Sequence, residues 1–349
     1  MKLGKSQIGV SKKPYIIAEM SGNHDQSIKR AKKIILSASQ SGVNAIKFQT
    51  YKPDTITIKS TREDFVINDK ESSWNGKNLY DLYSIGSTPW EWHKELIDYA
   101  YSLNLDCFSS VFDETAVDFL EDLNIKFYKI SSFELNHLPL LKKVASTKKP
   151  IILSTGMASL NEINEAIDTL VESNNDNYAL LKCTSNYPAD PKDSNILTIP
   201  FLKNKFKCEV GLSDHTLGIG ASLAAISHGA TIIEKHLKLF EDDKGIDAHF
   251  SLTPEQMKNL VDEANLTWNS LGKIFVGSTN NEEKSKKFKR SIYVSKDIKK
   301  NDVITKDNIK IIRPGFGLAP KYYDQIIGKR FKDNIDMGTP LKLENIIDK

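Results

Sequence analysis

Short apolar runs rich in β-branched residues alternate with longer segments of helical periodicity between residues 14 and 272. We predict eight strands: Tyr15–Met20, Val43–Thr50, Leu105–Ser110, Lys126–Ser131, Pro150–Thr155, Tyr178–Thr184, Cys208–Ser213 and Thr231–His236. The intervening segments, such as SIKRAKKIILSASQSG and PWEWHKELIDYAYSLN, often end in Gly or Asn, as helices do. Strand–helix alternation indicates an α/β fold with a parallel sheet. Eight units predict a (β/α)8 TIM barrel, with a doubly wound open sheet as the alternative.

Polar residues collect where the predicted strands end, although buried parallel strands are usually almost wholly apolar. Such residues are costly to bury unless they converge on a polar ligand. In a barrel they converge at the C-terminal face, which carries the active site. We therefore predict the site at the residues that end these runs: Glu19, Lys47, Gln49, Ser110, Lys129, Ser154, Lys182, Ser213, Glu234 and His236.

Two histidines follow the last two predicted strands, His215 in GLSDHT and His236 in IIEKHL. Adjacent parallel strands lie about 4.8 Å apart, so both imidazoles can reach one ion. Two histidines completed by oxygen ligands suit a borderline divalent metal such as Mn, Zn, Fe or Co. The alternative is a pair of hydrogen-bonded pocket histidines without a metal.

Four lysines lie on predicted barrel strands: Lys47, Lys129, Lys182 and Lys235. A buried lysine needs either an anionic ligand or an ion pair, for which Glu19, Glu134 and Glu234 are candidates. Two chemistries fit this set. In one, a metal polarises a sugar aldehyde while cations hold an anionic three-carbon donor. In the other, Lys182 forms a Schiff base as in an aldolase.

The chain divides into a predicted barrel domain at residues 1–275, a polar linker at 276–290 and a small second domain at 291–349. An insertion at 52–88 interrupts the barrel alternation. It is either a loop over the barrel mouth or a surface excursion with its own small core.

The composition of the chain mainly excludes certain partners and sites. The 349 residues carry a net charge of +3, which indicates neither a nucleic-acid nor a membrane partner. The three cysteines are isolated, without a CxxC pair, so we expect a reducing, cytoplasmic location. No Walker loop, dinucleotide fingerprint, GxSxG or HExxH motif occurs.

The motifs AEMSGNHDQS, KFQTY, YKISSFELNH, ILSTGMAS, CTSNYP, GLSDHT, EKHL and RPGFGL occur in this order along the chain. Together they resemble the sialic acid synthase family over essentially the whole sequence. The resemblance implies a phosphoenolpyruvate-dependent transferase that makes a nine-carbon 2-keto sugar acid. It also implies a TIM barrel followed by a small antifreeze-like (SAF) domain, and a homodimer in which each SAF domain is swapped onto the partner's active site.

SFELNH and LYDLYSIGSTPWEWH resemble the pseudaminic acid synthase branch of this family. The sialic and legionaminic branches usually carry SGE where this chain has Ser132, Phe133 and Glu134. The branch implies condensation of phosphoenolpyruvate with 2,4-diacetamido-2,4,6-trideoxy-L-altrose and water, releasing phosphate by C–O cleavage. A legionaminic or N-acetylneuraminic acid synthase with the same mechanism is one alternative, and a catalytically silent sugar-binding protein is another.

The resemblance also implies roles for individual residues. His215 and His236 match the metal ligands, with Mn²⁺ expected and Mg²⁺ or Co²⁺ as alternatives. Glu19, Glu134 and Asp247 match catalytic positions that face the acceptor or the reacting water. Arg313 matches an arginine delivered from the partner's SAF domain. The positions that match substrate contacts are Lys47, Gln49, Ser110, Lys129, Ser132, Ser154, Ser185, Tyr187 and Ser213; at Ser185 some relatives have Asn.

Overall fold

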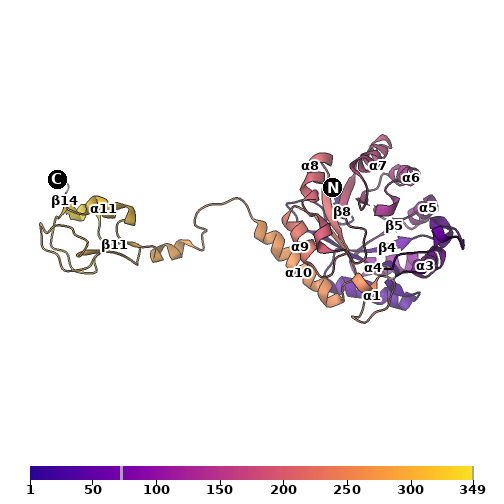
Figure 1. Ribbon diagram of the computed structural model, residues 1–349, viewed down its shortest axis with the longest axis horizontal. Helices are drawn as coiled ribbons and strands as arrows, with labels where there is room; N and C mark the ends of the chain where they lie inside the picture. The colour runs from indigo at the N-terminus through magenta and orange to yellow at the C-terminus, as the bar shows by residue number, and fades with distance from the viewer. Residues whose placement is uncertain (71–73, 348–349) are drawn as a thin grey trace. The chain divides into compact units, whose positions relative to one another are not determined.

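The computed structural model describes residues 1–70 and 74–347. Residues 71–73 of the predicted insertion and the last two residues of the predicted second domain lie outside the described residues. The chain forms two compact units, the first from Met1 to Gly272 and the second from Lys273 onward (Figure 1). Within the described ranges, no helix is both long enough and apolar enough to cross a membrane.

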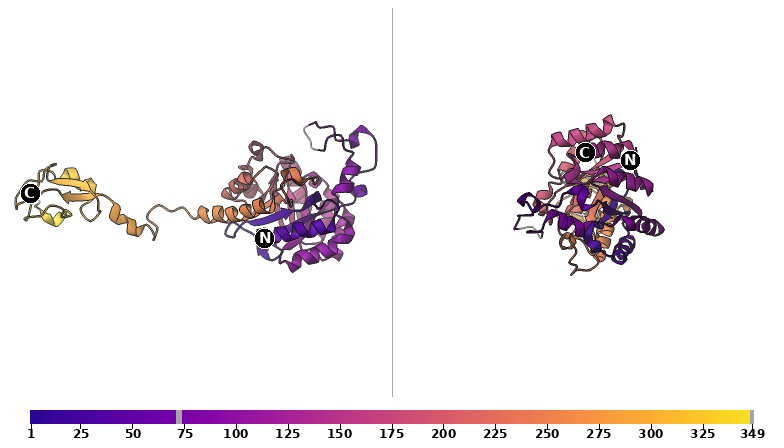
Figure 2. Two further views of the ribbon diagram at one scale, coloured as in Figure 1. Left: turned by 90° about the horizontal axis from the view of Figure 1, so that it is seen from below. Right: turned by 90° about the vertical axis from the view of Figure 1, so that its right-hand side faces the viewer.

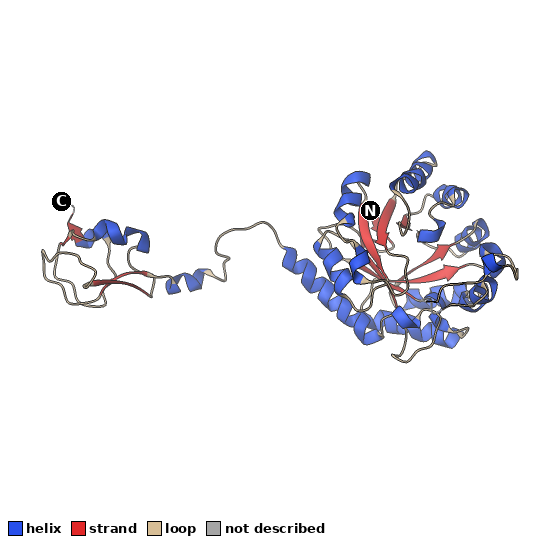
Figure 3. Ribbon diagram, in the orientation of Figure 1, coloured by secondary structure: helices blue, strands red, loops and turns tan. Residues whose placement is uncertain are grey.

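Eight parallel strands close into a barrel in the first unit (Figure 3). The ring closes where β10 pairs with β3, with Ile232 opposite Tyr15. This confirms the predicted TIM barrel and all eight predicted strands, and it excludes the open sheet. The strands are β3 (Tyr15–Glu19), β4 (Ala45–Thr50), β5 (Asp106–Val111), β6 (Tyr128–Ile130), β7 (Ile151–Ser154), β8 (Tyr178–Cys183), β9 (Glu209–Asp214) and β10 (Ile232–His236).

Helices surround the ring of strands (Figure 2), each with one apolar face packed onto the barrel core. Their ends follow local chemistry. Ser159 and Glu162 form a reciprocal capping box at the start of α7, and Gly42 ends α1 in the left-handed conformation. The helices are α1 (Ile28–Ser41), α4 (Trp90–Ser102), α5 (Glu114–Asp122), α6 (Leu138–Ser146), α7 (Leu160–Glu172), α8 (Thr198–Phe206), α9 (Gly220–Ser227) and α10 (Pro254–Leu271). A hairpin of β1 (Lys2–Leu3) and β2 (Ser6–Gln7) precedes the barrel.

The insertion between β4 and α4 contains α2 (Pro53–Ile56), a 3-10 turn at Glu63–Phe65 and α3 (Leu79–Gly86). Several of its side chains line a cavity at the C-terminal ends of the barrel strands, among them Ile56, Leu79 and Tyr83. Of the two predicted possibilities, the described part of the insertion therefore supports the loop over the barrel mouth.

The second unit has its own core around Ile292, Ile309 and Phe331. Its regular elements include β11 (Ser291–Val294), β12 (Ile309–Ile312), α11 (Tyr323–Ile326), β13 (Arg330–Phe331), β14 (Ile346–Ile347) and 3-10 helices at Glu283–Phe288, Pro320–Tyr322 and Leu343–Asn345. β11 pairs with β12, and β13 with β14, both antiparallel. The predicted linker 276–290 contains the 3-10 helix at Glu283–Phe288, and nearly all of its residues are exposed.

Candidate active site at the barrel mouth

A cavity of about 440 Å³ opens at the C-terminal ends of the barrel strands. Most of the predicted site residues line it, although they come from six strands or the loops that follow them. This is the convergence that a closed parallel barrel imposes on residues at its strand ends. The predicted residues in the cavity wall are Lys47, Gln49, Lys129, Ser132, Glu134, Ser154, Tyr187, Ser213, His215, His236 and Asp247.

Three predicted residues do not line the cavity themselves but contact side chains that do. Glu19 is fully buried and pairs with the Lys47 ammonium at 2.8 Å. Ser110 accepts a hydrogen bond from the same ammonium at 3.0 Å. The Ser185 hydroxyl lies 2.7 Å from that of Ser132. Arg313 belongs to the second unit, at the end of β12, so its role at the barrel stays a prediction.

Four buried charges form the base of the cavity, and we call Glu19, Lys47, Lys129 and Glu234 the charged floor. Lys129 donates to both oxygens of Glu234, at 2.9 and 3.1 Å. Burial opposes ionisation of Glu234, but Lys129 and Lys47 outweigh it and hold the Glu234 pKa at about 2. Burial raises the pKa of Glu19 despite its contact with Lys47. The floor therefore holds two ammonium groups facing the cavity, one firmly ionised carboxylate, and a second carboxylate that is easier to protonate.

The other two candidate lysines do not reach the cavity, so the Schiff-base role considered for Lys182 is wrong. Side chains alternate in direction along a strand, and Cys183 is the β8 residue that lines the cavity. Lys182 instead donates to the Cys183 carbonyl at 2.7 Å and to the Thr184 hydroxyl at 3.2 Å. Lys235 is directed away in the same manner and pairs with Asp214 at 3.1 Å.

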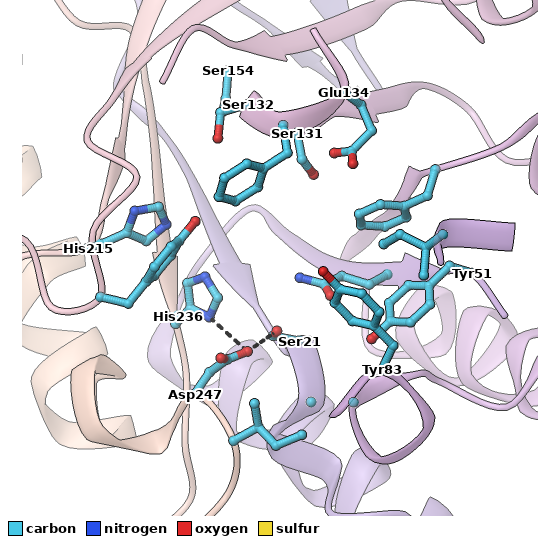
Figure 4. Close-up of a pocket in the computed structure, with 18 of the residues that line it drawn as sticks. Ser21, Tyr51, Tyr83, Ser131, Ser132, Glu134, Ser154, His215, His236 and Asp247 are labelled. Atoms are coloured by element: carbon cyan, nitrogen blue, oxygen red, sulfur yellow. Dashed lines mark hydrogen bonds and ion pairs between the residues drawn. The ribbon is translucent and has the colours of Figure 1, made fainter. Parts of the chain in front are cut away.

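Ser131, Ser132 and Ser154 lie close together on one side of the cavity (Figure 4). Ser132 and Ser154 both line the cavity. Among the described residues, the buried Ser154 hydroxyl has no hydrogen-bond partner. Gly156 allows the close packing here, because a Cβ on it would lie 2.3 Å from Ser132 Cβ. An unpartnered hydroxyl that lines the same cavity as two ammonium groups is suited to the oxygens of an anionic ligand.

His215 and His236 face each other with ring centroids 5.4 Å apart. His215 Nδ1 donates to the Thr184 carbonyl at 2.9 Å, which leaves the Nε2 lone pair free. Burial and the neighbouring His215, Lys47 and Lys129 hold the His236 pKa well below its usual range, so this ring is neutral. Within residues 1–70 and 74–347, the buried His236 Nδ1 has no hydrogen-bond partner. Despite burial, contacts with Cys183 and the Thr184 carbonyl raise the pKa of His215, so this ring must release its proton before Nε2 can bind a cation. With that proton lost, the two imidazoles fit a divalent cation.

Asp247 extends this arrangement, with Oδ2 at 4.0 Å from His236 Nδ1 (Figure 4). The Ser21 hydroxyl donates to Asp247. The Ser21 amide donates to Glu19 at 3.1 Å, so Ser21 joins two carboxylates. Its φ of +46° is unusual for a residue other than glycine. No group of three His, Cys, Asp or Glu side chains in the described part of the chain is arranged to hold a metal by itself, so water or substrate would have to complete the coordination.

Glu134 faces this group across the cavity (Figure 4). It ends the short 3-10 helix Ser132–Glu134 after β6. Burial raises its pKa to about 7. One of its oxygens is buried without a hydrogen-bond partner among the described residues. A carboxyl group with a pKa near neutrality can give up or take a proton at working pH.

Several residues of the cavity wall were not predicted from the sequence. Ser21 is one of them, although its position in AEMSGNH, two residues after Glu19, is a usable signal. Apolar residues such as Ile67 and Phe112 could not be assigned to the cavity from the sequence. An apolar residue in a loop gives the same sequence pattern whether its side chain faces a cavity or a hydrophobic core. The omitted wall residues also include Tyr51, Trp74, Leu79, Leu82, Tyr83, Cys183 and Ile246.

Comparison with known proteins agrees with this geometry. Residues 34–275 match the NeuB family, and residues 289–347 match the SAF domain. The chain is 41% identical to a pseudaminic acid synthase of Campylobacter jejuni, over 96% of this chain and 98% of that protein. It is 37% identical to an N,N'-diacetyllegionaminic acid synthase of Legionella pneumophila, over 97% and 96%. The crystal structure of N-acetylneuraminic acid synthetase from Leptospira borgpetersenii in complex with citrate superposes with a TM-score of 0.71 at 29% identity, covering 82% of this chain and 94% of that one.

Proposed function

Because the chain belongs to the NeuB family, we propose that it catalyses the reaction of a pseudaminic acid synthase. In this reaction C3 of phosphoenolpyruvate attacks the aldehyde carbon of open-chain 2,4-diacetamido-2,4,6-trideoxy-L-altrose. Water adds to C2 of the donor, and phosphate leaves with cleavage of the C–O bond. The observation that carries the proposal is the 41% identity to the Campylobacter jejuni enzyme over 96% of the chain.

The donor fits the charged floor and the serines above it. The ammonium groups of Lys47 and Lys129 face the cavity, and both offset the negative charge of a phosphate or carboxylate. The unpartnered hydroxyl of Ser154 supplies a hydrogen bond. Because Lys47 and Lys129 already pair with Glu19 and Glu234, the donor competes with these carboxylates. Protonation of Glu19, whose pKa is raised, would leave the floor with a net positive charge. The proposed donor contacts are Lys47, Gln49, Ser110, Lys129, Ser132, Ser154, Ser185 and Ser213.

His215 and His236 would hold a divalent cation, with Asp247 beside them. When bound, such an ion polarises the aldehyde oxygen of the acceptor and makes its carbon electrophilic. We expect Mn²⁺, because mixed imidazole and oxygen ligands suit a borderline metal, with Mg²⁺ and Co²⁺ as alternatives.

Glu134 is the proposed general acid–base group, because its pKa of about 7 lets it exchange a proton during the reaction. Glu19 and Asp247 are the other proposed catalytic carboxylates, and Tyr187 is the proposed aromatic contact to the acceptor. This role is supported by the 4.5 Å distance between the centroids of the Tyr187 and His215 rings.

The proposed assembly is a homodimer in which Arg313 of one subunit reaches the active site of the other. The barrel is assigned to 1–275, the linker to 276–290 and the SAF domain to 291–349. Mixing an Arg313→Ala variant with a His215→Ala variant, under demonstrated subunit exchange, should restore part of the activity. No restoration would contradict the swapped arrangement. The cytoplasmic location also stays a prediction.

The deciding experiment is phosphate release with Mn²⁺ and phosphoenolpyruvate in the presence of three acceptors tested separately. These are the trideoxy-altrose, the legionaminic precursor and N-acetylmannosamine. Release with the altrose sugar alone supports the proposal, and preference for another acceptor moves the chain to that branch. No release from folded, metal-loaded protein would favour the silent sugar-binding alternative. His215→Ala serves as the control, because it should abolish release without changing the far-ultraviolet circular dichroism.

A further inference from the structure

The cavity has two chemically different parts. One part contains the charged floor, the serines and the histidine pair. The other part contains six side chains without hydrogen-bonding groups, beside the aromatic rings of Tyr51, Trp74 and Tyr83. We call these six residues the apolar wall: Ile56, Ile67, Leu79, Leu82, Phe112 and Ile246. The first four of these belong to the insertion between β4 and α4. The apolar wall is thus supplied mainly by a segment that the barrel does not need for its own closure.

The insertion is fixed to the barrel by specific contacts. Gln26 donates through its side-chain amide to the carbonyls of Ile85 and Ser87, at 2.7 and 2.8 Å. Gly22 and Gly86 pack backbone to backbone, since a Cβ on Gly22 would lie 3.2 Å from Gly86 Cα. These contacts hold the end of α3 against the 3-10 turn that follows β3. The wall therefore has a defined position, as selective binding of a small group requires.

A second anchor joins the insertion to the loop after β10. The Trp74 indole donates to the Ile246 carbonyl at 3.2 Å, so the Ile246 side chain is held at the cavity from the barrel side. Leu82 is buried, and the other wall residues are half-buried, with only part of each side chain exposed. A hydroxyl group in contact with these six side chains would lose part of its hydrogen bonding to water and gain none from them.

The proposed acceptor has a polar reacting end and a methyl group at the other end. Its aldehyde carbon belongs near the histidine pair and the floor. Figure 4 shows Tyr83 of α3 across the cavity from His215 and His236. An open-chain sugar with its aldehyde at the histidine pair would therefore extend toward the insertion. Carbon 6 of a 6-deoxy sugar is a methyl group, whereas in a common hexose it carries a hydroxyl.

Building on the proposed function, we propose that the apolar wall selects the C6 methyl group of an open-chain 6-deoxy acceptor and disfavours a C6 hydroxyl. An apolar pocket discriminates against an added hydroxyl only moderately, by about 10- to 100-fold in kcat/KM. The insertion is then the part of the chain that determines this aspect of substrate specificity.

The test compares the trideoxy-altrose with its 6-hydroxyl counterpart, using phosphate release at saturating phosphoenolpyruvate. The wild-type protein should favour the 6-deoxy sugar by about 10- to 100-fold in kcat/KM. Ile246→Thr and Ile246→Val form a matched pair of nearly equal volume that differs in one hydroxyl. The preference should fall by about 3- to 10-fold in the Thr variant relative to the Val variant. The same comparison at Ile67 should give the same direction.

The control lies on the same insertion. Ile85 is 47% exposed and does not line the cavity, so Ile85→Thr and Ile85→Val should show equal preferences. Equal kcat/KM for the two sugars in the wild-type protein, or equal preferences in the Thr and Val variants at both wall positions, overturns the inference while leaving the proposed function intact. If only the legionaminic precursor reacts, the 6-deoxy and 6-hydroxyl pair is built on that sugar instead. Absence of phosphate release with every 6-deoxy sugar overturns the proposed function, and this inference with it.

Discussion

Lys129 on β6 and Glu234 on β10 form an ion pair across the interior of the barrel, with both Glu234 oxygens within 3.1 Å of the Lys129 ammonium. The two strands are four positions apart in a ring of eight, so they stand opposite each other. Lys47 approaches Glu234 at 3.7 Å from a third strand. One carboxylate therefore holds together two ammonium groups that would otherwise repel each other in a buried space.

Lys129→Met should destabilise the barrel by about 3 kcal/mol, because it leaves part of the Glu234 charge uncompensated in a buried site. The double variant Lys129→Met/Glu234→Gln should recover most of that loss, since it removes both charges. Urea unfolding at pH 7.5 measures the free energies of unfolding of the wild type, Lys129→Met, Glu234→Gln and the double variant. Additive losses would mean that the two side chains do not interact as the structure indicates.

Glu134→Gln should stabilise the protein at high pH while reducing its activity. Burial raises the Glu134 pKa from 4.5 to about 7, so the folded state holds a proton that the unfolded state has released between these values. Stability therefore falls as pH rises through this window, and the full cost is present above pH 7. The advantage of the variant in free energy of unfolding should grow by about 3 kcal/mol from pH 4.5 to pH 8.

The same variant separates the two roles of Glu134. Its kcat/KM should fall by about 10²- to 10⁴-fold, and the pH dependence near 7 should disappear from the residual activity. A variant with a normal pH profile would remove Glu134 from the proton-transfer step.

His93 should make the barrel sensitive to acid. It is fully buried between α4 and the barrel, with Nδ1 donating to the Pro89 carbonyl and Nε2 accepting from the Thr50 hydroxyl. Burial lowers its pKa from 6.5 to about 4. The stability that depends on the neutral ring is present above pH 6.5 and is lost as pH falls toward 4, by about 3 kcal/mol at most. His93→Gln should show a smaller loss over this range in chemical unfolding, and an unchanged slope would contradict the assignment.

Gly156→Ala should impair binding of phosphoenolpyruvate. The added Cβ would lie 2.3 Å from Ser132 Cβ and 2.7 Å from the Ser185 hydroxyl, and φ at this position is +46°. Gly229→Ala is the matched control, because φ is +91° there and nothing lies within 4 Å of the added Cβ. Each variant should lose about 1 kcal/mol of stability from backbone strain. Only Gly156→Ala should raise the KM for phosphoenolpyruvate, by about tenfold or more; equal KM values in both variants would remove these serines from the donor site.

Lys182→Met should retain the rate of phosphate release within about threefold of wild type. The Lys182 ammonium is hydrogen-bonded to the Cys183 carbonyl and the Thr184 hydroxyl and does not line the cavity. Borohydride treatment with pyruvate should leave the wild-type protein unlabelled. Trapping of a lysine adduct would revive the Schiff-base mechanism.

Much of the fold follows from local patterns. The eight apolar runs and the helices between them are readable because a buried parallel strand and an amphipathic helix each have a short, characteristic period. The same periodicity predicts that four polar residues lie at strand ends: Lys47, Lys129, His215 and His236. Once eight strands form a closed barrel, their C-terminal ends must meet, and so these residues are predicted together.

The sequence could not show which way each strand side chain points. Side chains alternate along a strand, and which of them face the barrel interior is fixed only when the strand pairs with both neighbouring strands. Lys129 points into the cavity and Lys182 does not, although both were candidates from sequence.

The sequence by itself determined the barrel, the family resemblance and the principal polar residues of the site, because these depend on periodicity and on short motifs. Only the tertiary structure decided that Glu234 neutralises Lys129 across the barrel, that Ser21 joins Glu19 to Asp247, and that the insertion supplies an apolar wall. Each of these depends on contacts between residues far apart in the chain. Such contacts leave no local pattern, because closure of the barrel and packing of the insertion bring the partners together.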